Sequence, residues 1–159
     1  MTKARLLVLP TLAILTVAIA TSATWGQTHV MEPLKDAKWG PAPPMLPAGA
    51  QMEVLEGNPV GEAMFTLRLK FPAKYDIPAH SHPKDEHVVV LSGDLYMGMG
   101  DKLDRKKGMG LGVGGFGLMP AEQNHFAYTK GETVILLYGI GPVEFKYVNP
   151  ADDPRDAKK

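Results

Sequence analysis

Four of the five histidines lie between residues 80 and 125, where their spacing suits a metal site. His80 and His82 are two residues apart, and a β-strand places such residues on one face, about 6.6 Å apart. Pro83 favours an extended backbone at His82, which supports this geometry. Two imidazoles at this separation can converge on one metal ion.

Two further side chains can reach the same point. Glu86 follows a short corner at residues 83–85 and can turn back toward the two histidines. His87 is its neighbour and is expected to face the opposite way. His125 follows Pro120 at the start of a separate predicted strand, so it can approach from across a barrel. The spacing of these groups predicts metal binding.

The elements that must position these residues are short strands. Residues 63–71 carry apolar side chains at the odd positions, which indicates a half-buried strand whose odd residues face inward. The chain contains 17 glycines and 14 prolines, which favour turns over long helices. Short strands between turns predict an antiparallel β-sandwich or barrel. The predicted strands cover residues 52–55, 63–71, 87–91, 95–99, 125–129, 133–140 and 143–148.

Composition narrows the class of protein. The 159 residues include 17 Lys+Arg and 17 Asp+Glu, and this zero net charge argues against nucleic-acid binding. A content of 45% hydrophobic and 21% charged residues is typical of a globular chain, and the length suits one domain. The absence of cysteine excludes disulfides, thiolate metal ligands and cysteine nucleophiles.

The first 26 residues have the build of a cleavable signal peptide. Lys3 and Arg5 precede an apolar run over 6–20, and small residues follow it up to Gly26. The alternative is a retained membrane anchor, but the run is shorter than the roughly 20 residues that a span needs, and Pro10 interrupts it. We therefore expect a periplasmic or secreted protein with no stable membrane anchor.

The remaining chain divides into three parts. Residues 27–50 are rich in proline and predict an extended arm, held on the barrel by Trp39 and Leu46. Residues 51–149 form the predicted β-barrel, which is a single domain once the signal peptide is removed. Residues 150–159 form a polar tail.

The histidine motif resembles that of the cupin superfamily. His80, His82, Glu86 and Gly93 fit the first cupin motif, H-x-H-x3-E-x6-G, and Gly114, Pro120 and His125 resemble the second, G-x5-P-x-G-x2-H-x3-N. The resemblance implies an all-β, antiparallel double-stranded β-helix, the cupin jelly-roll barrel. It also implies that the metal ligands are His80, His82, Glu86 and His125.

Three residues depart from these motifs. Lys74 stands six residues before His80, where the first motif usually opens with glycine. Glu122 replaces the glycine of the second motif, and Thr129 replaces its asparagine. Two segments that precede the first motif, Trp39 to Pro43 and Val54 to Gly57, look like the corresponding segments of small exported single-domain cupins. Those proteins are similar to the cupin domains of zinc-binding anti-sigma factors.

The implied ligand set suits one divalent transition metal ion, namely Fe, Mn, Ni, Cu or Zn, and does not suit calcium. Four protein ligands leave two positions of a six-coordinate ion open, and Glu86, on releasing the metal, could act as a catalytic base. The period of two in the strands predicts a mainly apolar pocket for a small organic molecule. Its predicted lining is Phe65, Val88, Val90, Met97 and Ala127. Glu122, three residues before His125, is predicted either at the mouth of this pocket as a second carboxylate or as a solvated loop residue.

Two functions are compatible with the implied metal ligands and the predicted pocket. The first is a metal-dependent oxidoreductase, similar to cupin dioxygenases, that acts on a small organic molecule. The alternative is a non-catalytic protein that binds or senses a metal or small ligand. A metal that ties strands together would also stabilise a small barrel. Pairing of two barrels into a homodimer, with the arm crossing to the partner, is a further expectation.

Overall fold

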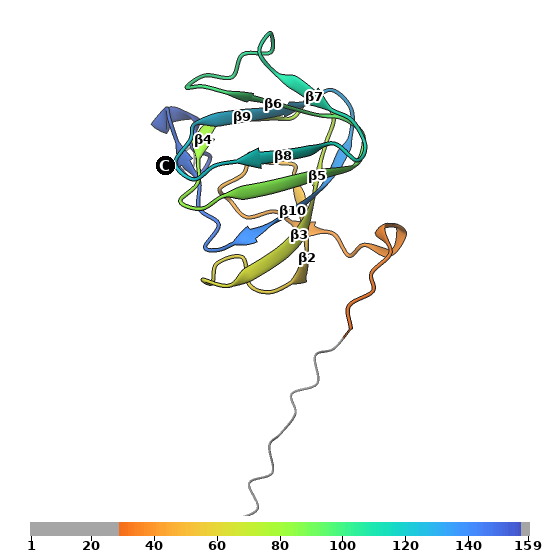
Figure 1. Cartoon of the computed structure of the whole chain (residues 1–159). Helices are drawn as coiled ribbons and strands as arrows, with labels where there is room; N and C mark the ends of the chain where they lie inside the picture. Colours follow the sequence, from red (N-terminus) through yellow and green to blue (C-terminus); the bar gives the residue numbers. More distant parts are fainter. Residues whose placement is uncertain (1–28, 157–159) are drawn as a thin grey trace, which may run out of the picture.

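The computed structural model describes residues 29–156, so the predicted signal peptide over 1–26 lies outside the described residues. Within them, the strands form two antiparallel sheets, which Figure 1 shows one above the other. The structure is therefore an all-β jelly-roll barrel, as the sequence predicts. Among the described residues, no helix has the length and apolar character needed to cross a membrane.

Six strands form the larger sheet and five the smaller one. In spatial order the larger sheet contains β1 (Gly40–Pro41), β2 (Gln51–Glu56), β3 (Met64–Phe71), β10 (Thr133–Ile140), β5 (Glu86–Ser92) and β8 (Phe116–Met119). The smaller sheet contains β11 (Lys146–Tyr147), β4 (Asp76–Ser81), β9 (His125–Thr129), β6 (Leu95–Met99) and β7 (Met109–Leu111). The helices in residues 29–156 are two short 3-10 turns, η1 (Leu34–Asp36) and η2 (Pro150–Asp152).

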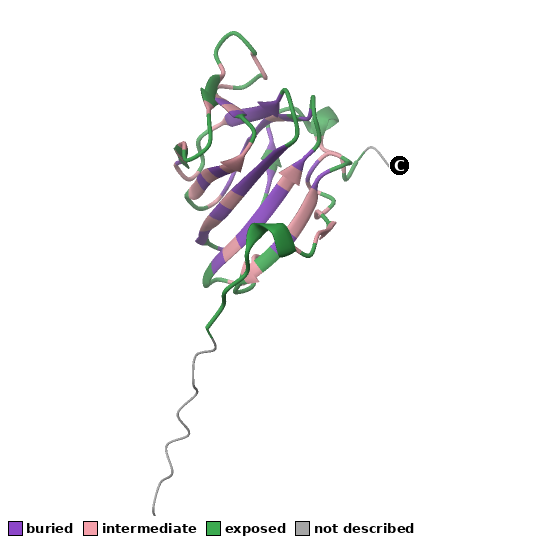
Figure 2. Cartoon of the chain, turned by 90° about the vertical axis from the view of Figure 1, so that its right-hand side faces the viewer, coloured by how far each residue is buried: buried purple, intermediate pink, exposed green. Residues whose placement is uncertain are grey.

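The core lies between the two sheets and follows the predicted alternation. In β3 the odd-numbered residues Phe65, Leu67, Leu69 and Phe71 are all buried, which confirms the inward face expected of this strand. Figure 2 shows the same alternation of buried and less buried positions along neighbouring strands. Burial of one apolar face of each sheet supplies the main stabilisation of such a barrel.

Arg68 in β3 breaks the alternation because the proline-rich arm covers it. Its Nη1 lies 3.0 Å from Oε2 of Glu53 in β2, and both side chains are buried. Glu53 Oε1 accepts a hydrogen bond from Lys38 N at 2.7 Å, and Arg68 Nη2 donates one to the carbonyl oxygen of Glu32 at 2.5 Å. The ion pair therefore joins the arm to the outer face of the larger sheet.

The arm also reaches the core and the sheet edge. Leu46 is buried among the core residues, and β1 pairs with β2. Lys70 Nζ lies 4.8 Å from the centroid of the Trp39 ring, a cation–π contact. These contacts hold the segment from residue 38 onward against the barrel.

The predicted strand over 143–148 is largely a loop in the structure. Strand pairing there is limited to β11, because the flanking backbone groups bond elsewhere: Val143 N donates to Pro59 O and Val148 N to Ala79 O. The structure also adds β1, β4, β7 and β8 to the predicted strands. Only an extended backbone was predicted for the end of β4, and glycine dominates residues 108–117, where β7 lies and β8 begins.

Gly93 lies in the turn between β5 and β6, and its replacement tests how strictly this turn requires glycine. Its φ is +73°, and a Cβ there would lie 2.3 Å from the carbonyl oxygen of Glu132. We expect Gly93→Ala to lower the free energy of unfolding by roughly 1–3 kcal/mol. Gly131→Ala is the matched control, since no atom lies within 4 Å of its added Cβ. Urea unfolding would check both, and equal losses would contradict the prediction.

Candidate metal centre

The two sheets together bring three histidines and one glutamate to one place. His80 and His125 are directly opposite each other in the pairing of β4 with β9, and His82 follows β4. The ligand atoms of these three histidines all lie within 4.8 Å of one another. Glu86 begins β5 in the other sheet, and its Oε1 and Oε2 lie 3.5 Å from His82 Nε2 and 3.6 Å from His125 Nε2.

Backbone carbonyls fix the orientation of all three imidazoles. A carbonyl oxygen only accepts a hydrogen bond, so the Nδ1 atom beside it carries the proton and Nε2 keeps its lone pair. The Nε2 atoms of His82 and His125 are buried without a hydrogen-bond partner, which suits metal ligands. The carbonyl contacts are Pro78 O to His80 Nδ1 at 2.7 Å, Glu144 O to His82 Nδ1 at 2.6 Å and Gln123 O to His125 Nδ1 at 3.0 Å.

The protonation states that a metal requires are favoured here. Burial, and then the neighbouring His125 and His82, lower the pKa of His80 to about 3. Burial alone would raise the pKa of Glu86, but the electrostatic interaction with His82 and the contact with His125 outweigh it and lower the pKa to about 2. At neutral pH His80 is therefore neutral and Glu86 ionised, so the donor set fits a transition metal ion.

These shifts predict how acid affects the metal-free protein. Both groups bind protons less readily when folded than when unfolded, so stability is present at neutral pH and falls as the pH decreases. The loss is expected from about pH 6.5 to 3 for His80 and from about pH 4.5 to 2 for Glu86. Thermal unfolding of metal-free protein across this range is the measurement. His80→Gln should flatten the upper part of the curve, and an unchanged curve would contradict the assignment.

A cavity adjoins the ligands, here called the metal cavity. Its volume is about 30 Å³. Three residues predicted for the pocket, Val88, Met97 and Ala127, line it. The full lining is Leu46, Leu69, Phe71, Ile77, His80, Glu86, Val88, Leu95, Met97, His125, Ala127, Ile135, Leu137 and Phe145.

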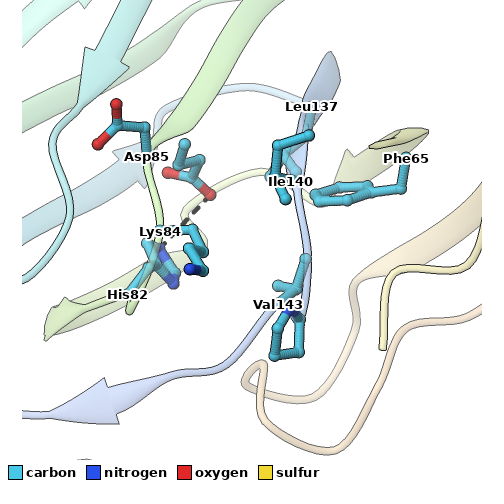
Figure 3. Close-up of a pocket in the computed structure, with 9 residues that line it drawn as sticks. Phe65, His82, Lys84, Asp85, Leu137, Ile140 and Val143 are labelled. Carbon is cyan, nitrogen blue, oxygen red and sulfur yellow. Dashed lines mark ion pairs between the residues drawn. The ribbon is translucent and has the colours of Figure 1, made fainter. Parts of the chain in front are cut away.

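A second, smaller cavity, the side cavity, adjoins His82 and Glu86. Phe65, another residue predicted for the pocket, lines it. Figure 3 shows His82 on one side of this space, with Leu137 and Val143 across from it. The dashed line marks the contact of His82 with Glu86. The ligands thus have free space on two sides.

The structure places two residues predicted for the pocket or its mouth elsewhere. Val90 is 1% exposed and belongs to the core, and Glu122 is exposed in a turn. Glu122 has a φ of +60°, and its N–H donates to His82 O at 2.8 Å. Within residues 29–156, neither side chain lines the metal cavity or the side cavity. His87 lies on the outer face, stacked on Tyr138 with 4.9 Å between ring centroids.

Phe145 is a site residue that the sequence analysis did not identify. Its ring stacks on His80 with 4.4 Å between centroids and meets His82 edge-on at 4.6 Å. It therefore covers two imidazoles and limits access of water to them. The aromatic residues at positions 145 and 147, which share one face of an extended segment, were the available signal.

An antiparallel jelly roll that holds an H-x-H pair, a glutamate and a distant histidine at one point defines the class of cupin proteins. The sequence matches the family model of the ChrR cupin-like domain over residues 27–144, so the chain belongs to this family. No curated protein sequence matches it significantly.

Solved structures share the fold at low sequence identity. The polyketide cyclase RemF from Streptomyces resistomycificus has a TM-score of 0.64 and 15% identity, over 82% of this chain and 93% of its own. KdgF from Halomonas sp. has a TM-score of 0.53 and 16% identity, over 72% of this chain and 96% of its own. At these identities the likeness concerns the fold.

Proposed function

We propose that this protein is an exported, metal-dependent oxidoreductase that acts on a small organic molecule in the manner of a dioxygenase. The observation that carries the proposal is the set of three oriented imidazoles and one carboxylate that faces an apolar cavity. In the proposal His80, His82, Glu86 and His125 hold one divalent ion of Fe, Mn, Ni, Cu or Zn. Such an ion supplies Lewis-acid and, for iron, manganese, nickel or copper, redox chemistry.

The protein's own residues would bind the substrate and exclude water. Val88, Met97 and Ala127 offer apolar contacts beside the ligands, and Phe145 covers the imidazoles. Glu86 is better suited to hold the cation than to accept a proton, because its pKa is lowered to about 2 and an efficient base has a pKa near the working pH. The base role predicted for Glu86 is therefore secondary to its role as a ligand.

A second candidate is a non-catalytic protein that binds or senses a metal or a small ligand. The small size of the metal cavity, about 30 Å³, favours it, because little room is left for an organic substrate beside a metal ion. Membership of the ChrR cupin-like family is compatible with this function.

The two candidates differ in turnover. The test uses protein loaded with Fe²⁺, with Zn²⁺-loaded protein as the redox-inert control, and acetylacetone as a small probe that chelates through two oxygens. An oxidoreductase should consume dioxygen only with iron and probe together. Tight binding of the probe without dioxygen uptake, for every redox metal tried and for larger diketones, would favour the binding protein.

Export is tested separately. The chain expressed with residues 1–26 should accumulate in the periplasm or medium as a shorter product, and the mass of that product gives the cleavage site. Full-length protein in the cytoplasm would contradict export.

A further inference from the structure

The side cavity borders the protein surface as well as the candidate metal centre. Its lining includes the exposed residues Lys84, Asp85 and Ile140. The metal cavity, in contrast, is lined by buried residues apart from Glu86. Glu86 lines both cavities, and its side chain is 12% exposed, compared with 6% for His82. These exposures place the approach from solvent on the side of Lys84 and Glu86.

Lys84 brings a positive charge to this approach. It lines the side cavity together with His82, and Figure 3 shows both residues on the same side of that space. Within residues 29–156, no carboxylate forms an ion pair with the Lys84 ammonium group. Its charge is therefore available to a ligand that enters the side cavity.

The acidic neighbour of Lys84 is engaged elsewhere. Asp85 Oδ1 accepts a hydrogen bond from Ala121 N, in the loop after β8, at 2.8 Å. In Figure 3 the Asp85 carboxylate points away from Leu137 and Val143, which lie across the side cavity. The carboxylate of Asp85 thus fixes a loop and does not neutralise Lys84.

The charges around the loaded centre favour an anion. In the proposed ligand set only Glu86 is negative, so one of the two charges of a bound divalent ion stays uncompensated, and Lys84 adds another positive charge. Apolar side chains complete the lining of the side cavity, namely Phe65, Leu137, Ile140, Pro142 and Val143. Opposite charges attract each other more strongly beside such a surface than in bulk water.

We propose that Lys84 determines the ligand specificity of the metal centre by selecting anions that enter through the side cavity. The ligand class is a small organic anion such as a carboxylate, whose negative group passes Lys84 on its way to the ion. Lys84 is a specificity residue here and not a metal ligand. This inference deepens the proposed function: it rests on metal binding by the centre and does not require turnover.

The test measures the binding of azide and acetate to Co²⁺-loaded protein by visible absorption at low ionic strength. Both probes are small, which suits a cavity of about 20 Å³. Lys84→Gln should weaken the binding of both anions about two- to fivefold, the range for a partly exposed ion pair. Lys84→Arg should retain the affinity, and Lys84→Glu should lose more than Lys84→Gln. Lys106→Gln is the matched control, because Lys106 is exposed in the loop between β6 and β7 and lies outside the side cavity.

The affinity for Co²⁺ itself separates a charge effect from damage to the site. Removing a positive charge beside a cation site reduces repulsion, so Lys84→Gln should bind Co²⁺ as tightly as the native protein or more tightly. Parallel losses of Co²⁺ and anion affinity would overturn the inference, and so would equal anion affinities in Lys84→Gln and Lys106→Gln.

The outcome is distinct from that of the proposed oxidoreductase. Anion binding that depends on residue 84, without dioxygen uptake, would reject the oxidoreductase and leave this inference standing. Dioxygen uptake with anion affinities independent of residue 84 would reject this inference alone. A native protein that fails to bind Co²⁺ would overturn both.

Discussion

Replacing His82 with alanine is expected to lower the affinity for Zn²⁺ or Co²⁺ at least about a hundredfold. Loss of a residue that only orients a ligand costs 10- to 100-fold in affinity, and loss of the ligand itself costs more. The structure gives His82 a carbonyl partner on Nδ1 and a buried, unpartnered Nε2 beside Glu86. Competition titration with a chromophoric chelator measures the affinity, and elemental analysis measures occupancy after purification.

His87→Ala is the matched control for this experiment. His87 lies five residues away on the outer face of the larger sheet, stacked on Tyr138 and outside the histidine cluster. Its loss should leave the metal affinity within about a factor of two, since a residue outside the ligand set and its partners changes neither charge nor orientation there. Equal losses in the two variants would mean that the metal is held elsewhere.

The proximity of His80, His82 and Glu86 was predictable from the sequence because their spacing is local. The H-x-H pair needs only an extended backbone, and the corner after His82 allows Glu86 to return to it. The sequence also predicted a strand over residues 125–129, and β9 has these bounds. The exact pairing of His80 with His125 was not predictable, because register depends on contacts between distant segments.

The glycine positions of the cupin motifs specify a backbone conformation rather than a metal ligand. Lys74 and Glu122, which stand where the cupin motifs have glycine, are the non-glycine residues with positive φ among residues 29–156, at +61° and +60°. The backbone conformation is therefore kept although the residue type has changed. Lys74 and Glu122 thus hold a left-handed conformation that glycine would adopt at a lower steric cost.

The contacts of the proline-rich arm were only partly predictable from the sequence. The pattern predicted an extended segment held by Trp39 and Leu46, and both contact the barrel. Alternation placed Arg68 on the outer face of β3, which predicts exposure. Its burial follows from the arm lying over that face, and such long-range coverage leaves no periodic signal in the sequence.

Glu53→Ala is expected to lower the free energy of unfolding by roughly 3–5 kcal/mol, the cost of leaving a buried charge without its partner. The side chains of Arg68 and Glu53 are only 9% and 8% exposed, so water cannot replace the lost carboxylate well. Arg68 Nε already lacks a hydrogen-bond partner, which increases its dependence on Glu53. Lys38 N would lose its acceptor as well, so the arm should become sensitive to proteases.

Two further variants separate the charge from the rest of the side chain. Glu56→Ala, at an exposed position of the same strand, should change the stability by no more than about 0.5 kcal/mol in urea unfolding. The double variant Glu53→Met with Arg68→Met removes both charges together, and apolar replacement of a buried pair is often neutral. We therefore expect it to be clearly more stable than Glu53→Ala. A double variant as unstable as the single one would show that the hydrogen bonds to the arm, rather than the unpaired charge, determine the loss.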